Sequence, residues 1–135
     1  MSIQVQHCHH VAFAITDTAR AKAFYGGLLG LREIARPAFA FDGVWYDLGG
    51  DQQLHLIVYP KAKTLRHDLA PDGLDAHLAL RVADYDQALA ALQAAGLTVR
   101  ANPDSITGWA QMFCTDPDGN VIELNAPRGR FKSVR

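Results

Sequence analysis

An internal repeat constrains the fold of this chain more than any other feature. Residues 10–31 read HVAFAITDTARAKAFYGGLLGL, and residues 77–97 read HLALRVADYDQALAALQAAGL. Each segment starts with a histidine, continues as an alternating apolar run, places an aspartate seven positions on, and closes on Gly-Leu. A repeated supersecondary unit sets the architecture of a chain. We therefore expect two copies of one structural motif.

The later parts of the two copies also match each other. The segment 47–56 reads DLGGDQQLHL and the segment 115–124 reads TDPDGNVIEL, so that His55 and Glu123 each precede a final leucine. The opening histidines are 67 residues apart (77 − 10), and His55 and Glu123 are 68 apart (123 − 55). Two offsets that agree within one residue argue against a chance resemblance.

Each copy reads as a strand, a helix and then further strands. The bulky residues of the first strands alternate with small ones, which is the period-two pattern of a strand with two distinct faces. These bulky residues are Val11, Phe13 and Ile15 in one copy and Leu78, Leu80 and Val82 in the other. They are expected to pack under the helix, which leaves the histidines on a face of small residues.

The boundaries of the two helices are marked by capping residues. Thr16 or Asp17 is expected to cap the first helix and Asp84 the second, by accepting hydrogen bonds from backbone N–H groups. Gly30 and Gly96 suit helix C-termini, where a left-handed residue is needed. The sequence thus predicts an α+β fold of two βαβββ modules.

The modules are expected to lie within a single domain spanning 1–135. The first occupies about 3–59 and the second about 77–126, and the segment 60–76, with two prolines and no clean periodicity, is the linker. The tail 126–135 contains four basic residues. A solvated, partly frayed terminus is the preferred interpretation of this tail, and an arm for an anionic partner is the alternative.

Composition excludes several classes of function. The formal net charge of −1 lacks the basic excess with which nucleic-acid binders displace counterions. No apolar run approaches the roughly 20 residues that cross a membrane. The two cysteines are too few for a disulfide scaffold, and the start lacks a secretory signal, so that we expect a cytoplasmic protein.

Four residues occupy equivalent positions in the two copies and form the candidate site. They are His10 and His77 on the first strands, and His55 and Glu123 on the last strands. Three imidazoles and a carboxylate suit one borderline divalent metal ion, such as Fe, Mn, Ni, Co or Zn. Glu123 and His55 are also the candidate catalytic groups. For His55 the roles of fourth ligand, general base and structural residue stay open.

Other candidates are weaker. Arg81 shares a face with His77, where it can neutralise a substrate anion or form an ion pair, and Trp45 is a candidate substrate contact. For Trp45, as for Phe41, Tyr46 and Trp109, a core position is the preferred interpretation. Three further histidines are expected to have no chemical role: His7 and His9, on the opposite strand face from His10, and His67, in the linker.

These segments resemble the vicinal oxygen chelate superfamily, which includes glyoxalases, extradiol dioxygenases, and bleomycin- and fosfomycin-resistance proteins. The sequence segments that carry the resemblance are HHVAFAITDTARAKAFYGGLLGL, HLALRVADYDQALAALQAAGL and DPDGNVIEL. The resemblance implies paired βαβββ modules that form a curved sheet or cup around a metal, commonly in homodimers. It implies that His10, His77 and Glu123 are metal ligands, and it places His55 at the fourth position, which is Glu in bacterial glyoxalase I.

The resemblance implies a metal-dependent lyase or isomerase that acts on a small oxygenated metabolite or thiol adduct. At the fourth position His55 stands in place of the glutamate of bacterial glyoxalase I. This replacement argues against lactoylglutathione lyase activity itself. A small Fe(II) ring-cleavage dioxygenase and a non-catalytic, drug-sequestering protein of the bleomycin-resistance type are the alternatives.

Overall fold

A computed structural model describes residues 1–128 and divides the chain into two compact units, Met1–Thr64 and Leu65–Arg135. The expected frayed tail falls mostly on residues 129–135, which lie outside the described part. The boundaries between modules and linker, and the single domain spanning 1–135, stay predictions. Among the described residues, no helix is long and apolar enough to cross a membrane.

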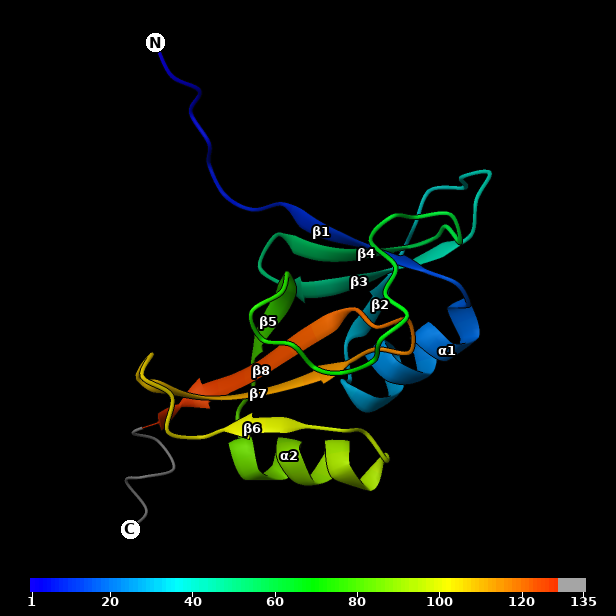
Figure 1. Ribbon diagram of the computed structural model, residues 1–135. Coiled ribbons are helices and arrows are strands. Elements are labelled where there is room, and N and C mark those ends of the chain that lie inside the picture. The colour runs from blue at the N-terminus through cyan, green and yellow to red at the C-terminus, as the bar shows by residue number, and fades with distance from the viewer. Residues whose placement is uncertain (129–135) are drawn as a thin grey trace. The chain divides into compact units, whose positions relative to one another are not determined.

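The first unit is a four-stranded mixed sheet with one helical segment (Figure 1). Its strand order is β1-β4-β3-β2, in which β1 runs parallel to β4 and the other neighbours are antiparallel. The elements are β1 (His10–Ile15), α1 (Thr18–Lys22), the π-helical turn η1 (Ala23–Leu28), β2 (Arg32–Ile34), β3 (Gly43–Gly49) and β4 (Gln52–Val58).

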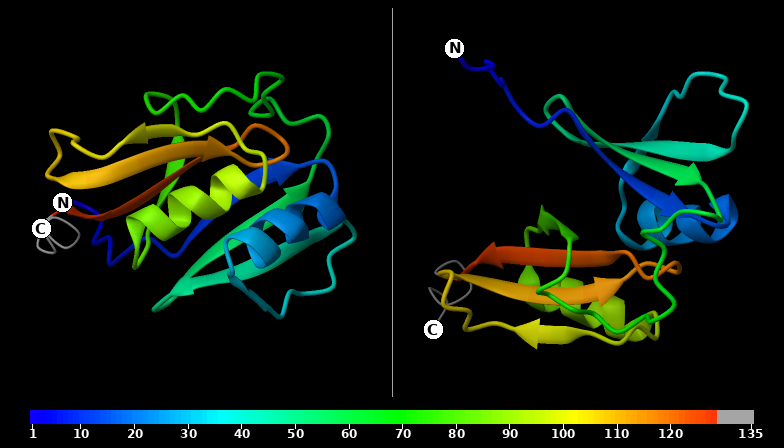
Figure 2. Two further views of the ribbon diagram at one scale, coloured as in Figure 1. Left: turned by 90° about the horizontal axis from the view of Figure 1, so that it is seen from below. Right: turned by 45° about the horizontal axis from the view of Figure 1, so that its top comes forward.

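The second unit repeats this topology with the order β5-β8-β7-β6, and β5 is parallel to β8. Its elements are β5 (His77–Arg81), α2 (Tyr85–Ala94), β6 (Arg100–Asn102), β7 (Trp109–Thr115) and β8 (Val121–Pro127). The predicted α+β fold of two βαβββ modules is therefore confirmed. Figure 2 shows that, within each unit, the helix lies across one face of that unit's own sheet.

The helices begin and end where the capping residues predict. The Asp17 carboxylate accepts hydrogen bonds from the backbone N–H groups of Ala19 and Arg20, and Asp84 accepts one from Gln87. Gly30 and Gly96 have φ values of 70° and 82°, a left-handed conformation that glycine adopts without steric cost. At these two turns the chain leaves the helix and returns to the sheet of the same unit.

The two faces of each sheet have different chemistry. Because side chains alternate along a strand, neighbouring positions in the register share a face. The helix-side faces form the cores of the units, with Ile15, Val44, Tyr46, Leu54 and Leu56 in the first and Leu78, Met112, Cys114, Ile122 and Leu124 in the second. The opposite faces carry the candidate site residues.

Two of the aromatic residues that were expected in the core are partly exposed instead. Tyr46 is buried, but Phe41 lies in the β2–β3 loop rather than in a strand, and its side chain is 44% exposed. Trp109 opens β7 and is 37% exposed. One ring lies in a loop and the other at the first position of a strand. At such positions strand alternation does not predict which side chains are buried.

The two cysteines are expected to react at very different rates. Cys8 is exposed, whereas Cys114 is buried, and burial together with the nearby Asp116 charge raises the pKa of its thiol to about 12. Since only the thiolate is nucleophilic, one thiol per chain should react with a disulfide reagent under native conditions, and the second only after unfolding. Cys8→Ser should remove the fast reaction; two fast thiols in the native protein would contradict this packing.

Candidate functional site

His77 and Glu123 form a close polar pair on the neighbouring strands β5 and β8. The distance from His77 Nε2 to Glu123 Oε1 is 3.2 Å. His77 Nδ1 lies 2.7 Å from the backbone carbonyl oxygen of Asp75, so the Nδ1–H donates to that oxygen. In neutral His77 the Nε2 lone pair then faces a carboxylate oxygen.

The side chain of Glu123, like that of His77, is fixed by a hydrogen bond. Its side chain is buried, with the residue only 4% exposed, and Asn125 Nδ2 donates a hydrogen bond of 2.7 Å to Oε2. The Phe113 ring packs edge-on against the His77 ring, with a centroid separation of 5.6 Å. One oxygen of the carboxylate is thus anchored by an amide, and the other is directed at an imidazole nitrogen.

This pair fits a divalent cation. Two lone-pair atoms that face each other need a proton or a metal ion to balance them. Neighbouring N and O ligands about 2.0–2.2 Å from a zinc-like ion lie roughly 3.0–3.4 Å apart, a range that contains the observed separation. The hydrogen bond from His77 Nδ1–H to a backbone carbonyl is the outer contact that metal-ligating histidines commonly make.

The first unit brings His10 and His55 together, but in a different geometry. Their rings are stacked, with centroids 4.1 Å apart and planes 20° apart. Trp45 stacks on the other face of His55 at 3.7 Å and 5°. An imidazole lone pair lies in the plane of its ring, and two planes so nearly parallel meet far beyond a metal–nitrogen bond length. For both histidines to bind one ion, one of the two rings has to rotate out of this stack.

The environment of His55 keeps its imidazole neutral. The residue is 7% exposed, and Gln53 Oε1 lies 2.8 Å from its Nε2, so the Nε2–H donates to the amide oxygen. Burial, followed by the charges of His10 and His9, lowers the pKa of His55 from 6.5 to about 4. An imidazole with so low a pKa is a weak base at neutral pH. Of the three roles left open for His55, the geometry favours the structural one.

The contact between the side chains of His9 and His10 was not predicted from the sequence. Its Nδ1 lies 2.9 Å from Nδ1 of His10, although strand alternation was expected to place the two rings on opposite faces. The alternation does not apply, because β1 begins only at His10. The adjacency of the two histidines was the one available signal. His67 is exposed, as expected.

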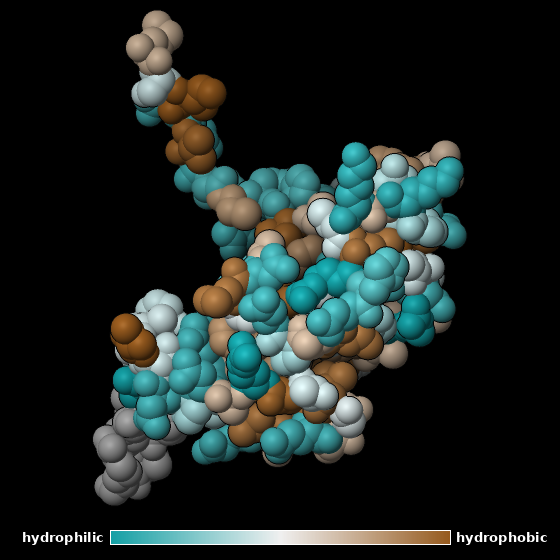
Figure 3. All heavy atoms as spheres, in the orientation of Figure 1, coloured by the Kyte–Doolittle hydropathy of each residue, from teal (hydrophilic) through white to brown (hydrophobic). Residues whose placement is uncertain are grey.

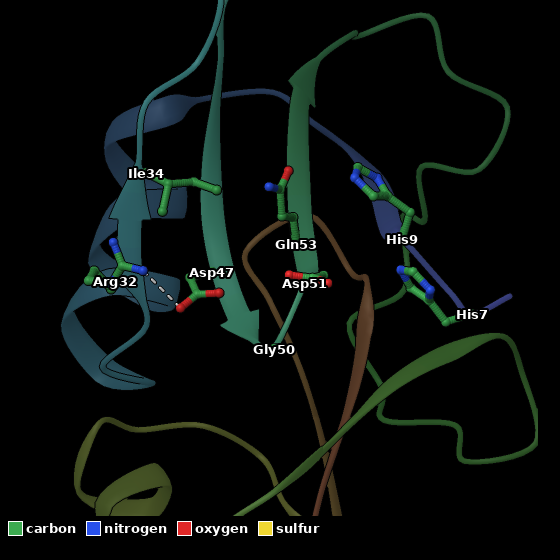
Figure 4. Close-up of a pocket in the computed structure, with 8 residues that line it drawn as sticks. All are labelled: His7, His9, Arg32, Ile34, Asp47, Gly50, Asp51 and Gln53. Atoms are coloured by element: carbon green, nitrogen blue, oxygen red, sulfur yellow. Dashed lines mark hydrogen bonds and ion pairs between the residues drawn. The ribbon is translucent and has the colours of Figure 1, made fainter.

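A pocket of about 460 Å³ lies beside this histidine cluster, within the first unit (Figure 4). His7 and His9 line one side of it, and the Arg32–Asp47 ion pair, 3.0 Å long, lines the other. Gln53, the partner of His55, contributes to its wall. The volume is in the range of small-molecule sites, and the lining is mostly polar.

The predicted substrate contacts occupy the faces that carry the site. Arg81 ends β5, lies beside Asn125 in the register, and is exposed. Among residues 1–128 no carboxylate lies within 4 Å of its guanidinium, so the ion-pair alternative finds no partner in the described chain. Trp45 is half-buried and stacks on His55. That either residue contacts a substrate stays a prediction.

The four predicted ligands thus fall into two pairs, one in each unit. Each pair joins the first and last strands of its own sheet, as the repeat predicts. Neither unit, over the described residues, gathers three or more His, Cys, Asp or Glu side chains by itself in a way that could hold a metal ion. The complete set of His10, His55, His77 and Glu123 stays a prediction.

Comparison with known proteins supports the resemblance found in the sequence. The chain is 32% identical over 126 residues to Escherichia coli "Uncharacterized protein YaeR", covering 89% of this chain and 95% of the relative. The structure of TnmS3, an antibiotic binding protein from Streptomyces sp. CB03234, is similar with a TM-score of 0.71 and 28% identity, covering 93% of this chain and 99% of that one. A glyoxalase family protein from Enterococcus faecalis has a TM-score of 0.65 and 29% identity, covering 89% and 97%.

A family model matches almost the whole described chain, over residues 7–124, and includes both polar pairs. The chain belongs to the Glyoxalase/Bleomycin resistance protein/Dioxygenase superfamily.

Proposed function

We propose that this protein is a metal-dependent lyase or isomerase that acts on a small oxygenated metabolite or a thiol adduct. The observation that carries the proposal is the His77–Glu123 pair, in which two lone-pair atoms face each other at 3.2 Å. The carboxylate and the imidazole are each fixed by a hydrogen bond to the other polar atom of the group, so they form a preorganised pair of ligands for a cation.

In this proposal two residues bind the ion and two others hold them in place. His77 Nε2 and Glu123 Oε1 would bind the ion, the Asp75 carbonyl orients the imidazole, and Asn125 holds the second carboxylate oxygen. Imidazole and carboxylate donors suit Fe, Mn, Ni, Co or Zn. When bound, such an ion acts as a Lewis acid that stabilises a developing oxyanion on the substrate. His10 stays the predicted third ligand.

Glu123 is the better candidate for moving a proton. With Oε1 on the ion, its Oε2 would keep a second lone pair beside the hydrogen bond from Asn125, and this lone pair can accept a proton from a substrate carbon or oxygen. His55 donates its Nε2–H to Gln53 and lies between two rings, which leaves it little freedom to exchange protons. Arg81 would pair with an anionic group of the substrate.

The proposal is tested by metal analysis followed by turnover. Protein purified without chelator should contain about one divalent ion per chain, and metal-loaded protein should convert a methylglyoxal–thiol adduct other than that of glutathione, which metal-depleted protein leaves unchanged. Oxygen uptake with catechols and Fe(II), without turnover of the adduct, would instead favour the dioxygenase alternative. A metal-free protein whose stability does not respond to any of the five metals would overturn the proposal.

A second candidate function is non-catalytic binding of a planar ligand. A row of aromatic rings supports it: Phe41 stacks on Phe39 at 4.8 Å, Phe39 lies 6.1 Å from Trp45, and Trp45 stacks on His55. Phe39 and Phe41 are each 44% exposed, and TnmS3 is an antibiotic binding protein. Quenching of tryptophan fluorescence by a planar aromatic compound, with equal affinity in metal-loaded and metal-depleted protein, would favour this function.

A homodimer in the cytoplasm completes the proposal. Members of the superfamily often form dimers. Apolar side chains are visible on the extended N-terminal segment (Figure 3), and Ile3 and Val5 are 89% and 83% exposed.

A further inference from the structure

The His9 imidazole contacts the His10 imidazole directly. The two Nδ1 atoms are 2.9 Å apart, and the rings meet edge to face with centroids 5.2 Å apart and planes 85° apart. The backbone of His9 is anchored as well, because its carbonyl oxygen accepts a 3.0 Å hydrogen bond from the N–H of Gln53 in β4. His9 therefore occupies a fixed position at the start of β1.

One hydrogen bond between two neutral imidazoles requires one donor and one acceptor. If His10 donates its Nδ1–H to His9, the Nε2 atom of His10 carries a free lone pair. If His9 donates instead, His10 is protonated at Nε2 and has no nitrogen free to bind a metal. The contact thus decides which nitrogen of His10 is available.

The second unit shows which arrangement a ligand histidine needs. His77, at the equivalent position of the repeat, donates Nδ1–H to the carbonyl oxygen of Asp75 and turns Nε2 toward Glu123. In the first unit the acceptor beside the corresponding nitrogen is the side chain of His9. Both opening histidines therefore have a partner at Nδ1, a backbone oxygen in one unit and an imidazole in the other.

We propose that His9 is a positioning residue: it accepts the Nδ1–H of His10 and so presents His10 Nε2 as a metal-binding nitrogen. The inference rests on the proposed function, because it assigns His10 to the metal. His9 itself does not bind the ion. Outer partners of ligand histidines typically contribute about 10- to 100-fold to metal affinity, and exposure of both rings places this contact near the lower end.

Three variants isolate this role. His9→Leu removes the acceptor, whereas His9→Asn places the amide Oδ1 close to the position of Nδ1 and retains it. His7→Leu is the matched control, since His7 lines the same pocket but forms no hydrogen bond with any of residues 1–128. The measurements are imidazole ¹⁵N NMR of the metal-free protein, which reports the tautomer of His10, and calorimetric titration with Zn²⁺ or Co²⁺.

In wild type and His9→Asn, His10 should carry its proton on Nδ1, and both should bind metal with similar affinity. His9→Leu should lose the Nδ1–H preference of His10 and bind metal about tenfold more weakly, while His7→Leu stays at the wild-type value. Nε2–H on His10 in the metal-free wild type would overturn the inference. So would an equal loss of affinity in His9→Asn and His9→Leu, or in His7→Leu and His9→Leu.

Failure of the proposed function has a different signature. A wild-type protein that binds neither ion overturns the metal site and with it the role of His9 toward that site. A wild type that binds metal, with a His9→Leu variant of unchanged affinity and unchanged His10 tautomer, overturns the positioning role alone.

Discussion

Glu123→Gln should reduce the affinity for the divalent metal at least about 100-fold while leaving the metal-free protein as stable as wild type. The amide removes the negative charge and one strong oxygen ligand, a larger change than the loss of an outer partner. The N–H₂ group of the new side chain can donate a hydrogen bond to His77 Nε2, so the two side chains stay hydrogen-bonded to each other. Calorimetric titration and chemical denaturation measure the two effects separately.

His77→Ala is the contrasting variant. It removes the other ligand and should weaken metal binding comparably, but it also leaves the buried Glu123 carboxylate with Asn125 as its hydrogen-bond partner among residues 1–128. The cost should be about 1–3 kcal/mol in the free energy of unfolding of the metal-free protein. Equal stability losses in both variants, or metal affinity retained in Glu123→Gln, would contradict the assignment of this pair.

Asp116→Ala should be the most destabilising substitution in the β7–β8 turn, by about 2–4 kcal/mol. The buried Asp116 carboxylate accepts hydrogen bonds from the backbone N–H groups of Asp118 and Asn120, both at 2.9 Å, and from the Asn120 side chain at 2.8 Å. Without it, buried donors lose their acceptor at the point where β8 begins. Denaturation monitored by circular dichroism gives the change in the free energy of unfolding.

Asp116→Asn is the matched control, because its carbonyl oxygen can still accept the two backbone hydrogen bonds. It should lose about half as much stability as the alanine variant. If both variants unfold at the same denaturant concentration as wild type, the turn is not held by this carboxylate.

The sequence predicted the topology well because the relevant signals are local or repeated. Strand alternation separates the helix-side core from the face that carries His10 and His77, and the caps at Asp17 and Asp84 depend on a few neighbouring residues. Repeat equivalence then paired the first and last strands of each unit. None of these inferences requires knowledge of side-chain rotamers.

The features that escaped prediction depend on side-chain geometry. Strand alternation cannot show that His10 and His55 stack rather than converge, since this depends on rotamers and on the Trp45 ring. It also fails for His9, because the first residue of a strand is not visible in the sequence pattern.

The linker shows the same limit of pattern reasoning. Its sequence has no periodicity, yet Thr115 donates a 2.8 Å hydrogen bond to the carbonyl oxygen of Leu69, and a Cβ on Gly73 would lie 2.8 Å from the Phe113 ring. The linker therefore packs closely against β7. Such a contact between distant residues leaves no local signal in the chain.

The parallel pairing of β1 with β4 and of β5 with β8 has a kinetic consequence. Each polar pair joins strands from opposite ends of its unit, and contacts of such long sequence separation form slowly because the loop-closure entropy must be paid first. A ligand at His77 and Glu123 therefore recognises only a unit whose last strand has docked. Added metal should slow the unfolding of that unit and leave its folding rate almost unchanged, so that the bound state persists longer without forming sooner.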